Sequence, residues 1–69
     1  MAYPYLDENS TQDLQYDLAM FQADGEQEGA LASAMIAVLH ERHVSLPTNA
    51  RWVYDPYAPF KKRLLYDLA

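Results

Sequence analysis

The chain has 69 residues with no cysteine, and ten acidic against five basic residues give it a net charge of −5. This size predicts one small domain over residues 1–69, whose core supplies no more than about 3 to 5 kcal/mol, while a hydrophobic content of 51% excludes intrinsic disorder. The lack of cysteine excludes disulfides and thiolate metal sites, so we expect self-association or a partner to add stability.

The first predicted element is a helix over residues 10–23. Ser10 or Thr11 can cap its start, because a hydroxyl there accepts a hydrogen bond from an unpaired backbone N–H. Asp24-Gly25 marks its end, because glycine readily adopts the positive φ that terminates helices. The helical period gives it two apolar flanks, made by Leu14, Leu18 and Phe21 on one side and by Tyr16, Ala19, Met20 and Ala23 on the other.

A second helix is predicted over residues 26–43, since Glu26 and Glu28 place negative charge in its first turn and nothing breaks the pattern before Pro47. Its core-facing side is formed by Leu31, Met35, Val38 and Leu39. The other side carries a strip of small residues along which another helix could approach closely: Gly29, Ala30, Ser33, Ala34 and Ala37. Either a C-terminal segment of the same chain or the same helix of a second copy covers this strip; we favour a homodimer with this interface.

Residues 44–55 are predicted to form a loop rich in aromatic residues. Arg51-Trp52-Val53-Tyr54 could form a short strand, but a lone strand has no mate visible in the sequence. A third helix is expected over residues 56–68, with Asp55 as its cap and Pro56 at its first position. This helix would place on one face Phe60, Leu64, Leu65 and Leu68. The predicted fold is therefore all-α, a helical hairpin followed by a short C-terminal helix.

A short segment of the chain occurs twice. Residues 14–19 read Leu-Gln-Tyr-Asp-Leu-Ala and residues 64–69 read Leu-Leu-Tyr-Asp-Leu-Ala, so five of six positions match. The two copies lie far apart in the chain and do not indicate a repeat architecture. We interpret both as turns of amphipathic helices.

Charge is divided unevenly along the chain. Residues 1–28 contain seven acidic residues and no basic one, whereas residues 29–69 contain three acidic and five basic residues. Such polarity could steer a partner, or bring the acidic part of one copy to the basic part of another. A solvated acidic surface is the simpler interpretation.

No membrane span or export signal is predicted. The longest uncharged run, residues 29–39, has eleven residues, whereas ~20 are needed to cross a bilayer. The first residues lack a basic stretch followed by an apolar one, so we expect a cytoplasmic protein.

No residue pattern points to catalysis, a cofactor or a metal. His40 and His43 are spaced i, i+3, whereas the helical zinc motif needs two His at i, i+4, and we interpret them as polar residues near a helix C-terminus. The hydroxyl residues lack the setting of an activated nucleophile, and two glycines do not form a phosphate-binding loop. We therefore predict that the protein is not an enzyme.

The composition favours protein binding. Tyr, Trp and Arg are enriched at the energetic centres of protein interfaces, because rigid rings bury a large area at a small entropic cost. The predicted partner-binding residues are Arg51, Trp52, Tyr54, Tyr57, Arg63 and Tyr66, with Tyr3 and Tyr5 as additions to the same surface. Trp52 and Phe60 could instead close the core of so small a domain.

We therefore predict a small acidic regulator or inhibitor that sterically blocks a partner protein, a type common among accessory proteins, including those of bacteriophages and other mobile elements. The alternative is a dimeric DNA-binding transcriptional regulator, with phosphate contacts from Arg42, Arg51, Lys61, Lys62 and Arg63. Two features oppose this alternative: the first helix is acidic, and the second offers Ala and Ser where base reading needs Arg, Asn or Gln.

Overall fold

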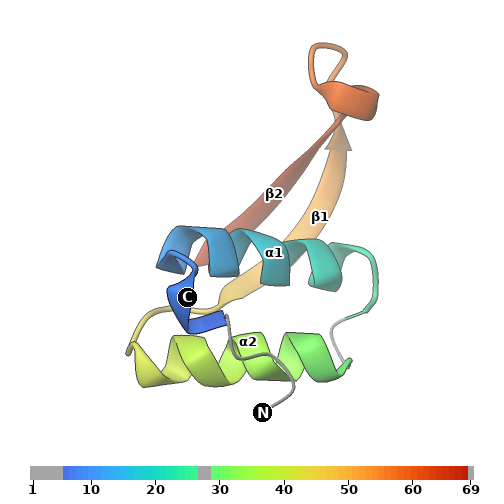
Figure 1. Ribbon diagram of the computed structural model, residues 1–69. Coiled ribbons are helices and arrows are strands. Elements are labelled where there is room, and N and C mark those ends of the chain that lie inside the picture. Colours follow the sequence, from blue (N-terminus) through green and yellow to red (C-terminus); the bar gives the residue numbers. More distant parts are fainter. Residues whose placement is uncertain (1–5, 27–28, 69) are drawn as a thin grey trace.

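Two helices are followed by a long β-hairpin in the computed structural model, which describes residues 6–26 and 29–68 (Figure 1). The helix α1 lies between the helix α2 and the hairpin, so the chain is an α+β protein with three layers. In chain order the elements are η1 (Leu6–Glu8), α1 (Thr11–Ala23), α2 (Ala30–Glu41), β1 (Pro47–Tyr54), η2 (Pro59–Lys61) and β2 (Lys62–Leu68).

Both ends of α1 carry the signals seen in the sequence. Ser10 is its N-cap, with extended backbone, and its Oγ accepts a hydrogen bond of 3.1 Å from the N–H of Asp13. Asp24 is the C-cap, and Gly25 follows with φ of 77°. A glycine there satisfies the left-handed conformation without steric cost, so local chemistry alone sets the bounds of this helix.

The helix α2 is shorter than the predicted 26–43. It begins after Gly29, which acts as N-cap without a side-chain bond, and ends at Glu41 before the cap residue Arg42. Of the acids expected in its first turn, Glu26 precedes the helix and Glu28 lies outside the described residues. Arg42 then ties the end of α2 to the start of α1, since its guanidinium donates to Thr11 Oγ1 (3.2 Å) and to the carbonyl of Asp7 (2.9 Å).

The prediction of an all-α fold with a third helix over residues 56–68 is wrong. Residues 62–68 form the strand β2, and most of the predicted 44–55 loop forms the strand β1. The strands are antiparallel and pair Arg51 with Leu65 and Trp52 with Leu64. Interstrand hydrogen bonds and the burial of Leu64, which is 7% exposed, outweigh the helical spacing of the leucines in this segment.

A β-bulge interrupts β1. The register shifts between Thr48 and Arg51, so that Asn49 and Ala50 together oppose Tyr66. Asn49 has φ of 56°, in the left-handed region that asparagine tolerates better than most residues.

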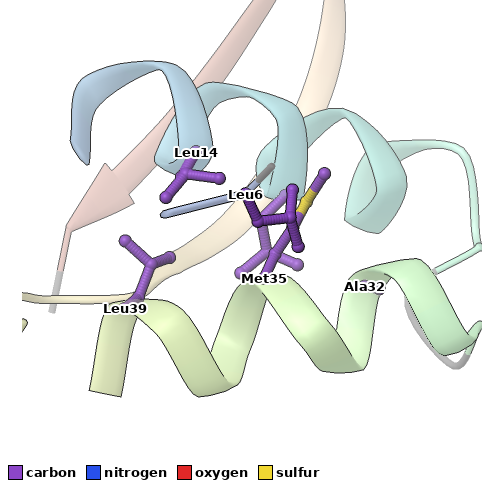
Figure 2. Close-up of a cluster of buried hydrophobic side chains, with 6 residues drawn as sticks. Leu6, Leu14, Ala32, Met35 and Leu39 are labelled. Atoms are coloured by element: carbon purple, nitrogen blue, oxygen red, sulfur yellow. The ribbon is translucent and has the colours of Figure 1, made fainter. Parts of the chain in front are cut away.

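The main core lies between α1 and α2 (Figure 2). Leu14, Leu18 and Leu39 are almost completely buried, and each contributes about 1.5 to 3 kcal/mol by leaving water. Leu6 of η1 closes one side of this cluster. The buried residues of the cluster are Leu6, Leu14, Leu18, Ala32, Met35 and Leu39.

A second surface of α1 carries the hairpin. Gln15 and Gln22 each donate from Nε2 to a backbone carbonyl, that of Ser45 and that of Pro47 respectively, both at 2.8 Å. Between them Ala19 is completely buried, and its small side chain lets β1 approach the helix. The C-terminal segment of the chain therefore covers the second flank of α1.

Candidate protein-binding site

The two faces of the hairpin have different surroundings. Leu64 and Tyr66 of β2 lie on the same face as Trp52 of β1, and this face is turned toward α1. Arg51 and Val53 lie on the opposite face together with Arg63, and in the described residues no helix covers that face. The six predicted partner-binding residues thus all lie in one hairpin but on different faces of it.

Trp52 and Tyr66 hold the hairpin to α1. The indole Nε1 of Trp52 donates to Asp24 Oδ1 at 2.8 Å, so the ring is fixed to the C-cap of the helix. The ring of Tyr66 meets that of Tyr16 edge to face, with centroids 6.4 Å apart and planes at 71°. Such pairs are worth about 0.5 to 1.5 kcal/mol beyond the area they bury. These two predicted site residues therefore have structural contacts within the chain.

Asp55 organises the loop that joins the strands. Its N–H donates to the carbonyl of Lys61 (3.0 Å), and its Oδ1 accepts from the N–H of Tyr57 (3.0 Å). Two further backbone bonds close the loop, from Ala58 N–H to the Asp55 carbonyl (3.2 Å) and from Lys61 N–H to the Ala58 carbonyl (2.9 Å). An aspartate bonded to the backbone two residues ahead forms an Asx turn, which gives the loop a defined conformation.

The loop presents aromatic rings to solvent at the outer end of the hairpin, away from the helices (Figure 1). Tyr54 is 75% exposed, Tyr57 96% and Phe60 93%. Phe60 and Lys61 have φ of 59° and 57°, a left-handed conformation that costs a bulky residue about 1 to 2 kcal/mol. We call Tyr54, Tyr57, Phe60 and Lys61 the tip cluster.

Phe60 is the residue of the tip cluster that the sequence interpretation misplaced. The helical pattern put it on an apolar face with Leu64, and the interpretation of Phe60 as a lid over the core is wrong because its ring is almost fully exposed. Pro56 and Pro59 lie on either side of Tyr57, between two apolar runs, and such spacing is a turn signal that indicates a hairpin loop.

The charge of the chain follows its architecture. Residues 1–43 contain eight acidic and one basic residue, whereas residues 44–69 contain two acidic and four basic ones. On the hairpin, Lys62 Nζ lies 4.4 Å from the centroid of the Trp52 ring and Arg63 Nε lies 3.8 Å from Asp55 Oδ2. The exposed guanidinium of Arg51 donates to the carbonyl of Asn49 at 2.7 Å.

The five cations of the DNA-binding alternative do not form one patch. Arg42 is bonded to Thr11 and to the Asp7 carbonyl where the two helices meet, whereas Lys61 belongs to the hairpin tip, which extends away from the helices. A duplex binder needs its cations along one track, so that they contact successive phosphates. The arrangement disfavours this alternative.

The acidic part of the molecule includes a carboxyl pair on α1. Asp13 and Asp17 are one helical turn apart. Partial burial, and to a lesser degree the charge of Asp13, raises the pKa of Asp17 above its usual value of 3.8.

The small-residue strip of α2 faces solvent within this chain. Gly29, Ala30, Ser33 and Ala37 are exposed, whereas Ala34 is half-buried against the core. These residues, which we predicted as a dimer interface, lie on one side of α2 and have no cover from the part of the chain that the structure describes.

Three further expectations from the sequence concern a metal site, a membrane span and the N-terminal tyrosines. Over residues 6–26 and 29–68, no three His, Asp or Glu side chains are grouped to hold a metal ion. Neither α1 nor α2 has the length and apolar character needed to cross a bilayer. Tyr3 and Tyr5 lie outside the described residues.

Comparison of the chain with protein-family models, with curated proteins and with solved structures gave no match.

Proposed function

We propose that the protein is a small regulator or inhibitor that binds another protein and blocks it sterically, by inserting the tip cluster into an apolar depression on that partner. The observation that carries this proposal is the nearly complete exposure of two aromatic rings, Tyr57 and Phe60, on a hydrogen-bonded loop. The α1-facing residues Trp52 and Tyr66 are left out of the proposed contact, because they hold the hairpin in place.

The free energy gained by burying the rings of the tip cluster is comparable with the free energy of binding in a micromolar complex. Burying an aromatic ring of this kind gains about 1.5 to 3 kcal/mol, and micromolar affinity corresponds to about 8 kcal/mol. Two rings therefore account for a large part of such an affinity before the ordering costs are counted. The Asp55 bonds to Tyr57 and Lys61 reduce those costs, because the loop is ordered before binding.

The proposal is tested by cross-linking at single positions. The photo-reactive residue p-benzoylphenylalanine is placed at Tyr57, and at the exposed Gln12 of α1 as the control, in chains expressed in their native cells. We expect a protein that cross-links at position 57 and not at position 12. The purified partner should then bind the Phe60→Ala chain at least tenfold more weakly, with the circular dichroism unchanged.

A partner that binds Phe60→Ala and Tyr57→Ala as tightly as the original chain contradicts the proposal. The DNA-binding alternative has its own test, the anisotropy of a labelled duplex at 50 mM salt. We expect no binding there. Binding that falls steeply by 200 mM salt would replace our proposal with that alternative, because it would indicate several phosphate contacts.

A further inference from the structure

The free edges of the hairpin differ in regularity. The described residues form a two-stranded sheet, so each strand has one edge without a strand beside it. The edge of β1 contains Pro47 and the bulge at Asn49 and Ala50, which hinder pairing with another strand. The strand β2 runs from Lys62 to Leu68 with neither proline nor bulge. A regular open edge of this kind is a template for strand pairing.

The hydrogen bond from Asp55 N–H to the Lys61 carbonyl fixes which backbone groups of β2 point outward. In an antiparallel ladder, residues directed toward the partner strand alternate with residues directed away from it. Since Lys61 bonds toward the β1 side, Arg63 and Leu65 do so as well. Leu64 and Tyr66 therefore direct their N–H and C=O groups to the open edge.

We propose that β2 pairs with β2 of a second copy, antiparallel and about a two-fold axis beside Leu65, to form a four-stranded sheet. Leu65 is the midpoint of the strand, so this register overlaps the whole of Lys62–Leu68 with itself. It places Leu64 opposite Tyr66 of the second copy, and both of these residues have outward backbone groups. The hydrogen-bonding pattern and the two-fold symmetry are thus compatible.

The side chains on the outer face of β2 complement one another in this register. Arg63 lies opposite Asp67 of the second copy, and the symmetry repeats this pair. Both side chains are exposed in the single chain. Arg63 Nε lies 3.8 Å from Asp55 Oδ2, and the guanidinium has further N–H donors that can bind a second carboxylate. Leu65, half-buried in the single chain, lies opposite its own copy. Opposite charges facing each other across strands stabilise a sheet.

Other registers lose this complementarity. A shift by one residue puts inward-directed backbone groups opposite outward-directed ones. A shift by two residues toward the tip places Arg63 opposite Leu65 of the second copy, and a shift by two in the other direction carries Arg63 beyond Leu68. Charge and backbone pattern thus select a single register.

Within residues 6–26 and 29–68, no further strand lies along the free edge of β2. The helix α1 packs mainly against β1, so β2 lies on the side of the hairpin farther from the helix. The tip cluster precedes Lys62 and stays outside the paired segment. The dimer therefore does not depend on the proposed function, and it would present two tips in one particle.

Charge reversal tests the pairing. Sedimentation equilibrium over a wide concentration range should show a dimer of the original chain. Arg63→Asp and Asp67→Arg should each raise the dissociation constant at least tenfold, because each brings like charges together. An equal mixture of the two variants should restore dimers, since the aspartate introduced in one chain then faces the arginine introduced in the other. Lys61→Asp, a comparable reversal in the tip, should leave the constant unchanged.

Cross-linking reports the register directly. The chain has no cysteine, so Leu65→Cys introduces a single thiol. In a pair without interstrand hydrogen bonds the two Cα atoms are ~4.5 Å apart, within the range that a disulfide spans. Under mild oxidation this variant should form a disulfide-linked dimer, whereas Val53→Cys, on the same face of β1, should not.

Two results overturn the proposal. A chain that stays monomeric up to millimolar concentration has no such dimer. A dimer that persists in both charge variants, with no Leu65→Cys cross-link, uses another interface, of which the small-residue strip of α2 is then the first candidate.

Discussion

The same five-residue pattern takes two conformations in this molecule. Residues 14–18 lie within the helix α1, and residues 64–68 lie within the strand β2, although the segments differ only at Gln15 and Leu65. Ala19 continues the helix, while Ala69 lies outside the described residues. Their surroundings, and not their own side chains, therefore decide which hydrogen bonds the backbone makes.

The residues before each segment account for part of the difference. Residues 14–18 follow the N-cap Ser10, and the helix continues from there to Ala23. Residues 64–68 follow Phe60 and Lys61, whose left-handed backbone turns the chain back along β1. A helix begins at a residue that caps its free N–H groups, whereas a strand forms where a second strand lies close enough to share hydrogen bonds with it.

Burial differs between matched residues of the two segments. Leu18 is 1% exposed and Leu68 is 52% exposed. The matched tyrosines Tyr16 and Tyr66 pack against each other, so the two copies of the segment meet in space. The same substitution at matched positions of the two segments tests how strongly the surroundings of a side chain determine its contribution to the free energy of unfolding.

The largest expected difference is between Leu18→Ala and Leu68→Ala. The first change opens a cavity in the core and should cost about 3 kcal/mol, enough to unfold much of a domain this small. The second removes a half-exposed side chain and should cost below about 1 kcal/mol. Urea titrations followed by circular dichroism measure both. Equal costs would contradict the burial described above.

The next largest difference is expected between Gln15→Leu and Leu65→Gln, which exchange the one residue that differs between the two segments. Gln15→Leu makes the two segments identical but leaves the Ser45 carbonyl without the amide that now bonds it, at a cost of about 2 kcal/mol. Leu65→Gln changes a half-buried residue on the outer face and should cost below about 0.5 kcal/mol. Urea titration at low chain concentration compares them. A Gln15→Leu chain as stable as the original would mean that this hydrogen bond contributes nothing.

The contact between Tyr16 and Tyr66 should give a coupling energy. Each change to alanine, and both together, complete a double-mutant cycle. We expect a coupling of about 1 kcal/mol, as for other edge-to-face pairs. Strictly additive costs would show that α1 and β2 do not stabilise each other through these rings.

The smallest expected effect concerns Asp17. Because its folded-state pKa is raised, the folded chain binds the proton more tightly than the unfolded chain does, so stability from this group falls as pH rises through and above 3.8. Asp17→Asn should therefore stabilise the chain at pH 7, by less than about 0.5 kcal/mol since the group is largely solvated. The gain should vanish at pH 3. Glu8→Gln, which changes an exposed carboxylate of η1 outside the proposed dimer interface, is the control. A loss of stability in Asp17→Asn at pH 7 would contradict the sign.

The sequence by itself determined the helix α1, and it placed the predicted binding residues in one segment, residues 51–66. The Ser10 cap and the Asp24-Gly25 stop act within a few residues, so they need no distant partner. The six predicted binding residues all fall in the hairpin, and Tyr54 and Tyr57 among them are exposed at its tip. Composition was enough for this, because aromatic and basic residues are concentrated in that part of the chain.

Only the tertiary structure decided that the C-terminal part is a hairpin. It also decided which of the aromatic side chains there are exposed to solvent and which pack against α1. The leucine spacing of residues 64–68 fits a helix as well as a strand, and the mate of Arg51–Tyr54 lies beyond the loop 55–61. Strand hydrogen bonds form only when both segments meet, and α1 supplies the surface on which they do. Tyr66 was therefore indistinguishable from Tyr57 in the sequence, and Trp52 from Phe60, since packing against α1 is a long-range contact that no local pattern encodes.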